Sequence, residues 1–158
     1  MTPYAVAIIL RGSYVSPFLL AIELYKREWY GHGAILFSDG RLVEASAWEN
    51  KVVVRYHPCE WYHYEEVLDL SHLGLPAQQR IAELALSMQG WKYDWRALKS
   101  QAMENICSYN EEDSRRVICY EAVTLATKEF LQYFTDYHLV DSKEIIDSWN
   151  RSLHSAAG

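Results

Sequence analysis

Short apolar runs separated by turn residues fill the first half of the chain, and apolar residues at helical spacing fill most of the second half. A run of about four to eight apolar or β-branched residues bounded by Gly, Pro, Asn or Asp is typical of a strand. We predict strands over Tyr4 to Leu10, His32 to Phe37, Arg41 to Ser46, Lys51 to Arg55 and Glu65 to Leu70. Consecutive strands joined by short turns indicate an antiparallel meander.

Apolar residues three and four positions apart predict the helices. We expect helices over Phe18 to Lys26, Pro76 to Met88 and Val117 to Tyr133, a helix capped by Asp94 that runs through Ala102, and a short last helix that begins at Asp141. Asp141 and Glu144 have the spacing of a capping box, and His154 to Gly158 is expected to be a frayed tail. Strands followed mainly by helices define the α+β class. Residues 1–158 have the size of one domain and contain no linker, so we expect a single domain.

The composition excludes several classes of protein. Half of the 158 residues are hydrophobic and the formal net charge is -6, which is globular rather than disordered. Basic residues form no cluster beyond Arg115-Arg116, so we expect no nucleic-acid partner. The N-terminus lacks the features of an export signal, and no apolar run approaches the roughly 20 residues that span a bilayer. We therefore expect a cytoplasmic protein without a transmembrane segment.

The three cysteines, Cys59, Cys107 and Cys119, indicate a reactive thiol rather than a framework of disulfides or a zinc site. Their number is odd and no CxxC motif occurs. His57, Cys59 and His63 fit no standard zinc spacing, and a proline interrupts them, so we predict no metal and no cofactor. Cys107 lies in a polar stretch without an obvious base and is the fallback nucleophile.

Cys119 lies where a polar stretch becomes an apolar helix. We expect that helix to begin between Ser114 and Val117, which places the thiol in its first turn. Unpaired backbone N–H groups and the positive end of the helix dipole favour a thiolate at this position. Arg115 and Arg116 add positive potential. The backbone N–H of Cys119 is also a candidate donor to an oxyanion.

His32 and Glu44 lie on two consecutive predicted strands, and the turn between them decides whether they share a face. A two-residue loop would place them on opposite faces of the hairpin. A three-residue loop, Ser38-Asp39-Gly40, pairs Phe37 with Arg41 and places both side chains on one face. Its last residue is a glycine, which suits the left-handed conformation that this loop requires. We therefore predict the three-residue loop.

These three residues have the chemistry of a thiol hydrolase. Cys119 would attack a carbonyl, and His32 would take the thiol proton and later protonate the leaving group. Glu44 would orient the imidazole and stabilise its cationic form.

The order of these three residues along the chain resembles that of the NlpC-type papain-like cysteine peptidases, in their circularly permuted, YiiX-like branch. The matching segments are His32-Gly33-Ala34-Ile35, Leu42-Val43-Glu44-Ala45, Gly90-Trp91-Lys92-Tyr93-Asp94 and Ile118-Cys119-Tyr120-Glu121. The resemblance implies a permuted papain-like fold, in which helices pack on a small antiparallel barrel-like sheet. It implies hydrolysis of amides or esters through a thioester, with peptidoglycan peptides or related acyl amides as substrates.

The resemblance also marks the surroundings of the thiol. It implies that Tyr93 is an active-site tyrosine. The family usually has Ser before the His and after the Cys, where this chain has Gly31 and Tyr120. We therefore expect Tyr120, together with Trp95, to contact the substrate. Without an export signal, a cell-wall substrate would require a non-classical route of delivery.

Two alternatives stay open. The aromatic segment Trp61 to Tyr64 favours a lipid-amide hydrolase or acyltransferase of the lecithin:retinol acyltransferase-like type, with an apolar groove leading to the thiol. The second alternative is non-enzymatic: a catalytically degenerate domain that is retained as a binding module. The reactivity of Cys119 distinguishes the binding module from both enzymes.

Overall fold

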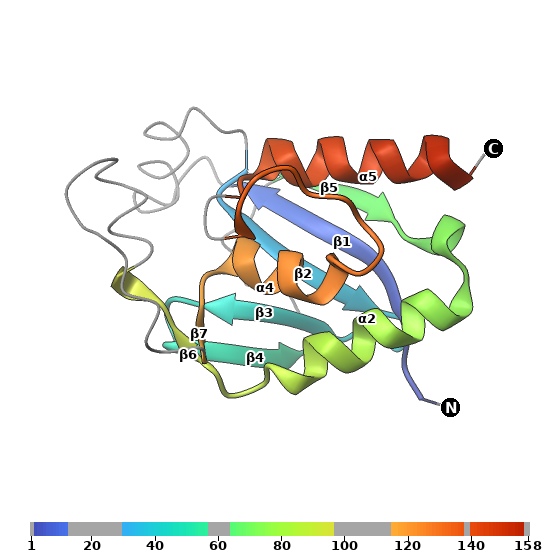
Figure 1. The fold of residues 1–158 in the computed structure, drawn as a ribbon. Helices are drawn as coiled ribbons and strands as arrows, with labels where there is room; N and C mark the ends of the chain where they lie inside the picture. Colours follow the sequence, from blue (N-terminus) through green and yellow to red (C-terminus); the bar gives the residue numbers. More distant parts are fainter. Residues whose placement is uncertain (1, 13–29, 57–63, 97–114, 138–139, 157–158) are drawn as a thin grey trace.

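The computed structural model describes residues 2–12, 30–56, 64–96, 115–137 and 140–156 (Figure 1). Its strands are β1 (Ala5–Gly12), β2 (His32–Phe37), β3 (Leu42–Ser46), β4 (Lys51–Arg55), β5 (Tyr64–Asp69), β6 (Lys92–Tyr93) and β7 (Arg116–Val117). Its helices are the 3-10 turn η1 (Ser71–Leu73), α2 (Leu75–Ser87), α4 (Cys119–Thr127) and α5 (Ser142–Ala156).

The strands form one sheet in the order β5-β1-β2-β3-β4-β6-β7. The pairs from β5 to β6 are antiparallel, and β6 and β7 are parallel. The α+β class is therefore confirmed. The sheet is open at β5 and β7, so the barrel-like closure implied by the family resemblance is not observed among the described residues.

The hairpin of β2 and β3 has the three-residue loop that its sequence predicts. Ile35 pairs with Val43 and Leu36 with Leu42. The same register brings Phe37 opposite Arg41, whose carbonyl accepts a hydrogen bond from the Phe37 N–H at 2.8 Å. The glycine at the end of the loop has φ = 85°, the left-handed conformation that glycine adopts without strain.

Helix α4 is shorter at both ends than the predicted helix over Val117 to Tyr133. It begins at Cys119 because Arg116–Val117 is extended and pairs with β6 instead. It ends at Thr127, where the chain turns and the Thr127 hydroxyl lies 2.7 Å from the hydroxyl of Tyr133. A long-range contact thus overrides the local helical pattern at the start of the helix, and a local turn ends it.

Helix α5 begins after Asp141, whose carboxylate accepts a hydrogen bond from the Glu144 N–H at 2.8 Å. The N-cap is confirmed, but the Glu144 carboxylate accepts from the Phe134 N–H rather than closing a capping box. The helix runs to Ala156, so the expected fraying from His154 is wrong for the residues that are described.

Asp94 also caps a helical start, because it accepts from the Arg96 N–H at 3.1 Å. The continuation of that helix through Ala102 and the predicted helix over Phe18 to Lys26 lie outside the described residues.

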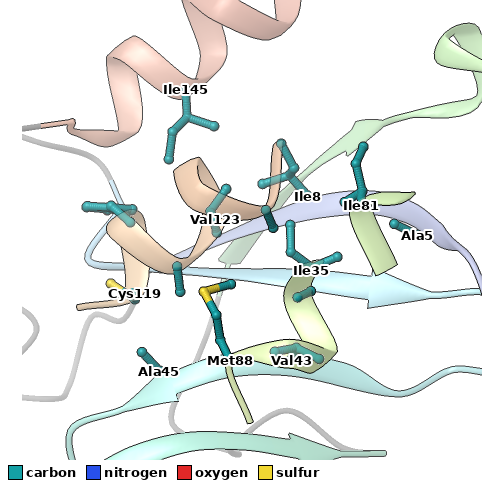
Figure 2. Packing of buried hydrophobic residues seen from close by; sticks show 14 of the residues in the cluster. Ala5, Ile8, Ile35, Val43, Ala45, Ile81, Met88, Cys119, Val123 and Ile145 are labelled. Atoms are coloured by element: carbon teal, nitrogen blue, oxygen red, sulfur yellow. The ribbon is translucent and has the colours of Figure 1, made fainter. Parts of the chain in front are cut away.

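The main core lies between the sheet and the helices. Helix α4 packs on β2 and β3, and α2 packs on α4 and β1. Figure 2 shows this core, with Cys119 at the start of α4 and Val123 one turn further along the helix. A smaller apolar cluster on the sheet comprises Ala7, Ile9, Ala34 and Leu42. No helix in the described part of the chain has both the length and the apolar character needed to cross a membrane.

Candidate active site

The candidate site lies where α4 begins beside the diverging ends of β2 and β3. The ladder between these strands contains only the pairs at Ile35 and Leu36 among the described residues. The two strands therefore separate toward His32 and Glu44. Figure 1 shows the start of α4 at this end of the sheet. The hairpin and the helix thus bring together residues that are far apart in the sequence.

Cys119 is the first residue of α4 and is a free cysteine with 7% of its surface exposed. The preceding residue, Ile118, has no side-chain acceptor for a cap. The carboxylate of Glu121 forms the other half of a capping box, because it accepts a hydrogen bond from the Ile118 N–H at 3.1 Å. The Cys119 N–H, at the first helical position, has no acceptor within the helix.

The imidazole of His32 and the carboxylate of Glu44 share the same face of the hairpin. His32 Nε2 lies 2.6 Å from Oε2 of Glu44, which is 1% exposed. The other carboxylate oxygen, Oε1, accepts a hydrogen bond from Nε of Arg55 at 2.5 Å. The buried carboxylate therefore has one partner on each oxygen, as a charge removed from water requires.

His32 also interacts with the thiol. Burial lowers the pKa of His32, but the charge of Glu44, followed by a hydrogen bond with Cys119, raises it to about 10. Because Nε2 of the His32 ring bonds Glu44, Nδ1 is the ring nitrogen that is available to the sulfur of Cys119. The pKa of Glu44 moves the other way: burial raises it, but His32 and then Arg55 lower it to about 2. With this pKa, His32 is an imidazolium at neutral pH, and it interacts with the carboxylate of Glu44 and with the sulfur of Cys119.

Tyr93 and Trp95 lie on the segment beside the start of α4. Tyr93 pairs in register with Val117, two residues before the thiol, and it is buried. Trp95 is 46% exposed, its ring centroid lies 5.0 Å from that of Tyr93, and its indole N–H donates to Asn50 at 2.9 Å. Their roles toward a substrate stay predictions.

Tyr120 is buried, and its hydroxyl donates a hydrogen bond to the backbone carbonyl of Tyr30. Its ring packs on Gly33, the residue after the histidine of the site. These contacts tie α4 to β2 and make Tyr120 part of the support of the site. Its expected contact with the substrate stays a prediction.

Substituting Gly33 tests this contact. A Cβ at this position would lie 3.2 Å from Cδ1 of Tyr120 and 3.4 Å from Cγ2 of Val123. Overpacking costs about 1–3 kcal/mol, and the lower entropy of the unfolded chain returns about 0.4–1 kcal/mol. We expect Gly33→Ala to lower the free energy of unfolding by about 1 kcal/mol, measured with urea. In the double variant Gly33→Ala/Tyr120→Phe, the Phe ring has no hydroxyl to anchor it. We therefore expect the double variant to lose less unfolding free energy than its two single variants lose in sum. Equal stability of Gly33→Ala and wild type would contradict the close contact.

The sequence alone did not identify Arg55 as part of the site. A partial signal was present, since Arg55 ends a Val-rich strand and is, with Lys51, one of the two charged residues that the β3–β4 hairpin brings diagonal to Glu44. The register pairs Glu44 with Val53, which places Arg55 two positions further on the same face.

Several candidates lie outside the described residues. They are the fallback nucleophile Cys107, the set His57, Cys59 and His63, and the residues Trp61 to His63 of the aromatic segment. Within the ranges that the structure describes, no three His, Cys, Asp or Glu side chains are grouped to hold a metal ion.

Comparison of the chain with protein-family models gives no match, and comparison with curated proteins gives none either. The candidate site therefore depends on its own geometry: an imidazolium held between a buried carboxylate and a thiol at a helix N-terminus.

Proposed function

We propose that this chain is a cysteine-dependent hydrolase of amide bonds with a permuted papain-like fold. The observation that carries the proposal is the interaction of His32 with Glu44 on one side and with Cys119 on the other. A cationic imidazole and a helix N-terminus both favour the thiolate, which is the nucleophilic form of cysteine. The chain order His, Glu, Cys agrees with the permuted family that the sequence resembles.

In the proposed reaction, Sγ of Cys119 attacks the carbonyl carbon of the substrate. The developing oxyanion accepts a hydrogen bond from the Cys119 N–H. The C–N bond breaks as His32 transfers its proton to the leaving amine, and a thioester remains. Water then attacks the thioester and gives a proton to His32, which releases the carboxylic acid and restores the thiolate and the imidazolium. Glu44 stabilises the imidazolium throughout.

The proposed substrates are peptidoglycan peptides or related acyl amides. The family resemblance favours them, and the exposed ring of Trp95 beside the start of α4 offers a surface for a peptide. A lipid-amide substrate would instead need an apolar groove, and the aromatic residues that motivated this alternative lie largely outside the described residues.

The test is incubation of the full chain with purified muropeptides and, in parallel, with a long-chain N-acyl amide. Mass spectrometry should detect muropeptide fragments whose combined mass exceeds that of the substrate by one water. The matched control is the same protein after alkylation with iodoacetamide, which should form no product. Cleavage of the lipid amide alone would favour the acyltransferase-like alternative. No product from either substrate, with a thiol as slow as free cysteine, would favour the binding module and contradict the proposal.

A further inference from the structure

Arg55, the last residue of β4, contacts the carboxylate on which the proposed mechanism depends. Its Nε donates to Oε1 of Glu44 at 2.5 Å, and its Nη2 forms an ion pair with the same oxygen. The second oxygen, Oε2, bonds His32. The carboxylate cannot rotate without losing one of these charge-assisted hydrogen bonds.

We propose that Arg55 is a positioning residue, which holds Glu44 so that Oε2 faces His32. This inference rests on the proposed function, because it assigns Arg55 to the same reaction. Glu44 is almost completely buried, whereas the Arg55 side chain is 31% exposed. The guanidinium therefore reaches from the surface to a carboxylate that lies out of contact with water. A buried carboxylate beside an imidazole alone would lack a partner for its second oxygen.

Titratable and charged groups face this carboxylate or its two partners. His32 on β2 and Arg55 on β4 contact it, Cys119 on α4 interacts with the imidazole, and Glu49 after β3 pairs with Arg55. Arg11 lies opposite His32 in the sheet, but its charge pairs with Glu65 at 3.3 Å. Glu49 lies 3.5 Å from Arg55. Arg55 is therefore a permanent cation in direct contact with Glu44.

The rate at which iodoacetamide alkylates Cys119, measured against pH, tests this role without a substrate. Mass spectrometry of the Cys119 peptide separates its alkylation from that of the other two cysteines. In Arg55→Met, Glu44 should protonate at a higher pH and cease to stabilise the imidazolium. We expect the acid limb of the rate profile to move up by about one pH unit. Lys keeps the positive charge but lacks the paired N–H donors of a guanidinium, so Arg55→Lys should move the acid limb less.

Arg41→Met is the matched control, because Arg41 pairs with Asp39 at 2.7 Å in the turn of the β2–β3 hairpin. We expect its profile to coincide with that of wild type. A shift as large as that of Arg55→Met would show that any lost cation has this effect, and would overturn the inference.

A double-mutant cycle shows whether Arg55 acts through Glu44. In a Glu44→Gln background, the further change Arg55→Met should leave the profile unchanged. An equal shift in both backgrounds would mean that the charge of Arg55 acts on the thiol directly. A loss of stability without a shift would mean a merely structural role. Either result overturns the inference, and if Arg55→Met does not fold, Arg55→Lys allows the same comparison.

An open pocket of about 360 Å³ provides a second readout, because Arg55 lines it together with Glu49, Lys51 and Gln89. In Arg55→Ala, the space left by the side chain should admit a guanidinium ion from solution. Dilute guanidinium should then restore the acid limb, whereas equimolar sodium should not. No recovery in Arg55→Ala, or an equal recovery in Glu44→Gln/Arg55→Ala, would count against the positioning role.

The wild-type profile separates the two proposals. A thiol that is alkylated like free cysteine at every pH contradicts the proposed function itself. An activated wild-type thiol, with Arg55 variants that keep the wild-type profile, contradicts the role of Arg55 and leaves the hydrolase intact.

Discussion

Replacing Cys119 by Ala is expected to lower the rate of amide hydrolysis by at least about 10⁴-fold, to the level of the uncatalysed reaction plus any contribution from binding. Without the sulfur, no thioester forms, and the imidazolium of His32 has no nucleophile beside it. The measurement is product formation by mass spectrometry on whichever substrate the wild-type protein cleaves. Since Ala is small and apolar, the buried position should accept it with little change in unfolding free energy.

Cys119→Ser is the companion variant. Its hydroxyl keeps a hydrogen-bonding group next to His32, but an alcohol ionises far less readily than a thiol, so this variant should also be inactive. Both variants should still bind the substrate, which calorimetry can measure. A Cys119→Ala variant that keeps most of the wild-type rate would rule out this thiol as the nucleophile.

The second large effect is expected for Glu44→Gln, which should lower the free energy of unfolding by about 3 kcal/mol near pH 6. Gln keeps the shape of the side chain but removes the charge, so that Arg55 and a protonated His32 lose their shared counter-ion. Urea denaturation of both proteins measures the difference. Glu49→Gln is the control: Glu49 is a surface residue 3.5 Å from Arg55, and its change should stay within about 0.5 kcal/mol.

The difference in unfolding free energy between wild type and Glu44→Gln should depend on pH. The pKa of His32 is raised from 6.5 to about 10, so its stabilising contribution is complete below about pH 6.5 and is lost as the pH rises through 10. The pKa of Glu44 is lowered from 4.5 to about 2, so its contribution is complete above about pH 4.5 and is lost as the pH falls toward 2. The stability difference between wild type and Glu44→Gln should therefore be largest between these two limits. A difference that does not depend on pH would contradict the ion pair.

Local sequence predicted the strands of the hairpins well. The predicted bounds His32 to Phe37 and Lys51 to Arg55 agree with the structure, because runs of apolar and β-branched residues between turns need no distant partner to be extended. The loop between β2 and β3 was predictable for the same reason, since its terminal glycine adopts the left-handed conformation locally.

Features that depend on residues far apart in the sequence were not predicted from the sequence alone. The predicted start of α4 was too early because β6 takes Arg116–Val117 into the sheet. Tyr120 gave no signal that it would bond the Tyr30 backbone, which is 90 positions away. The role of Arg55 depends on which carboxylate oxygen of Glu44 bonds the imidazole of His32. No pattern along the chain indicates which oxygen this is.

The sequence by itself determined that His32 and Glu44 share a face, because a hairpin with a known loop length assigns every side chain to one face or the other. It also indicated a thiol in the first turn of a helix. Only the tertiary structure decided that this thiol reaches the imidazole, since Cys119 follows Glu44 by 75 positions. That meeting depends on the packing of α4 on β2 and β3, where buried surface from distant segments outweighs local preference.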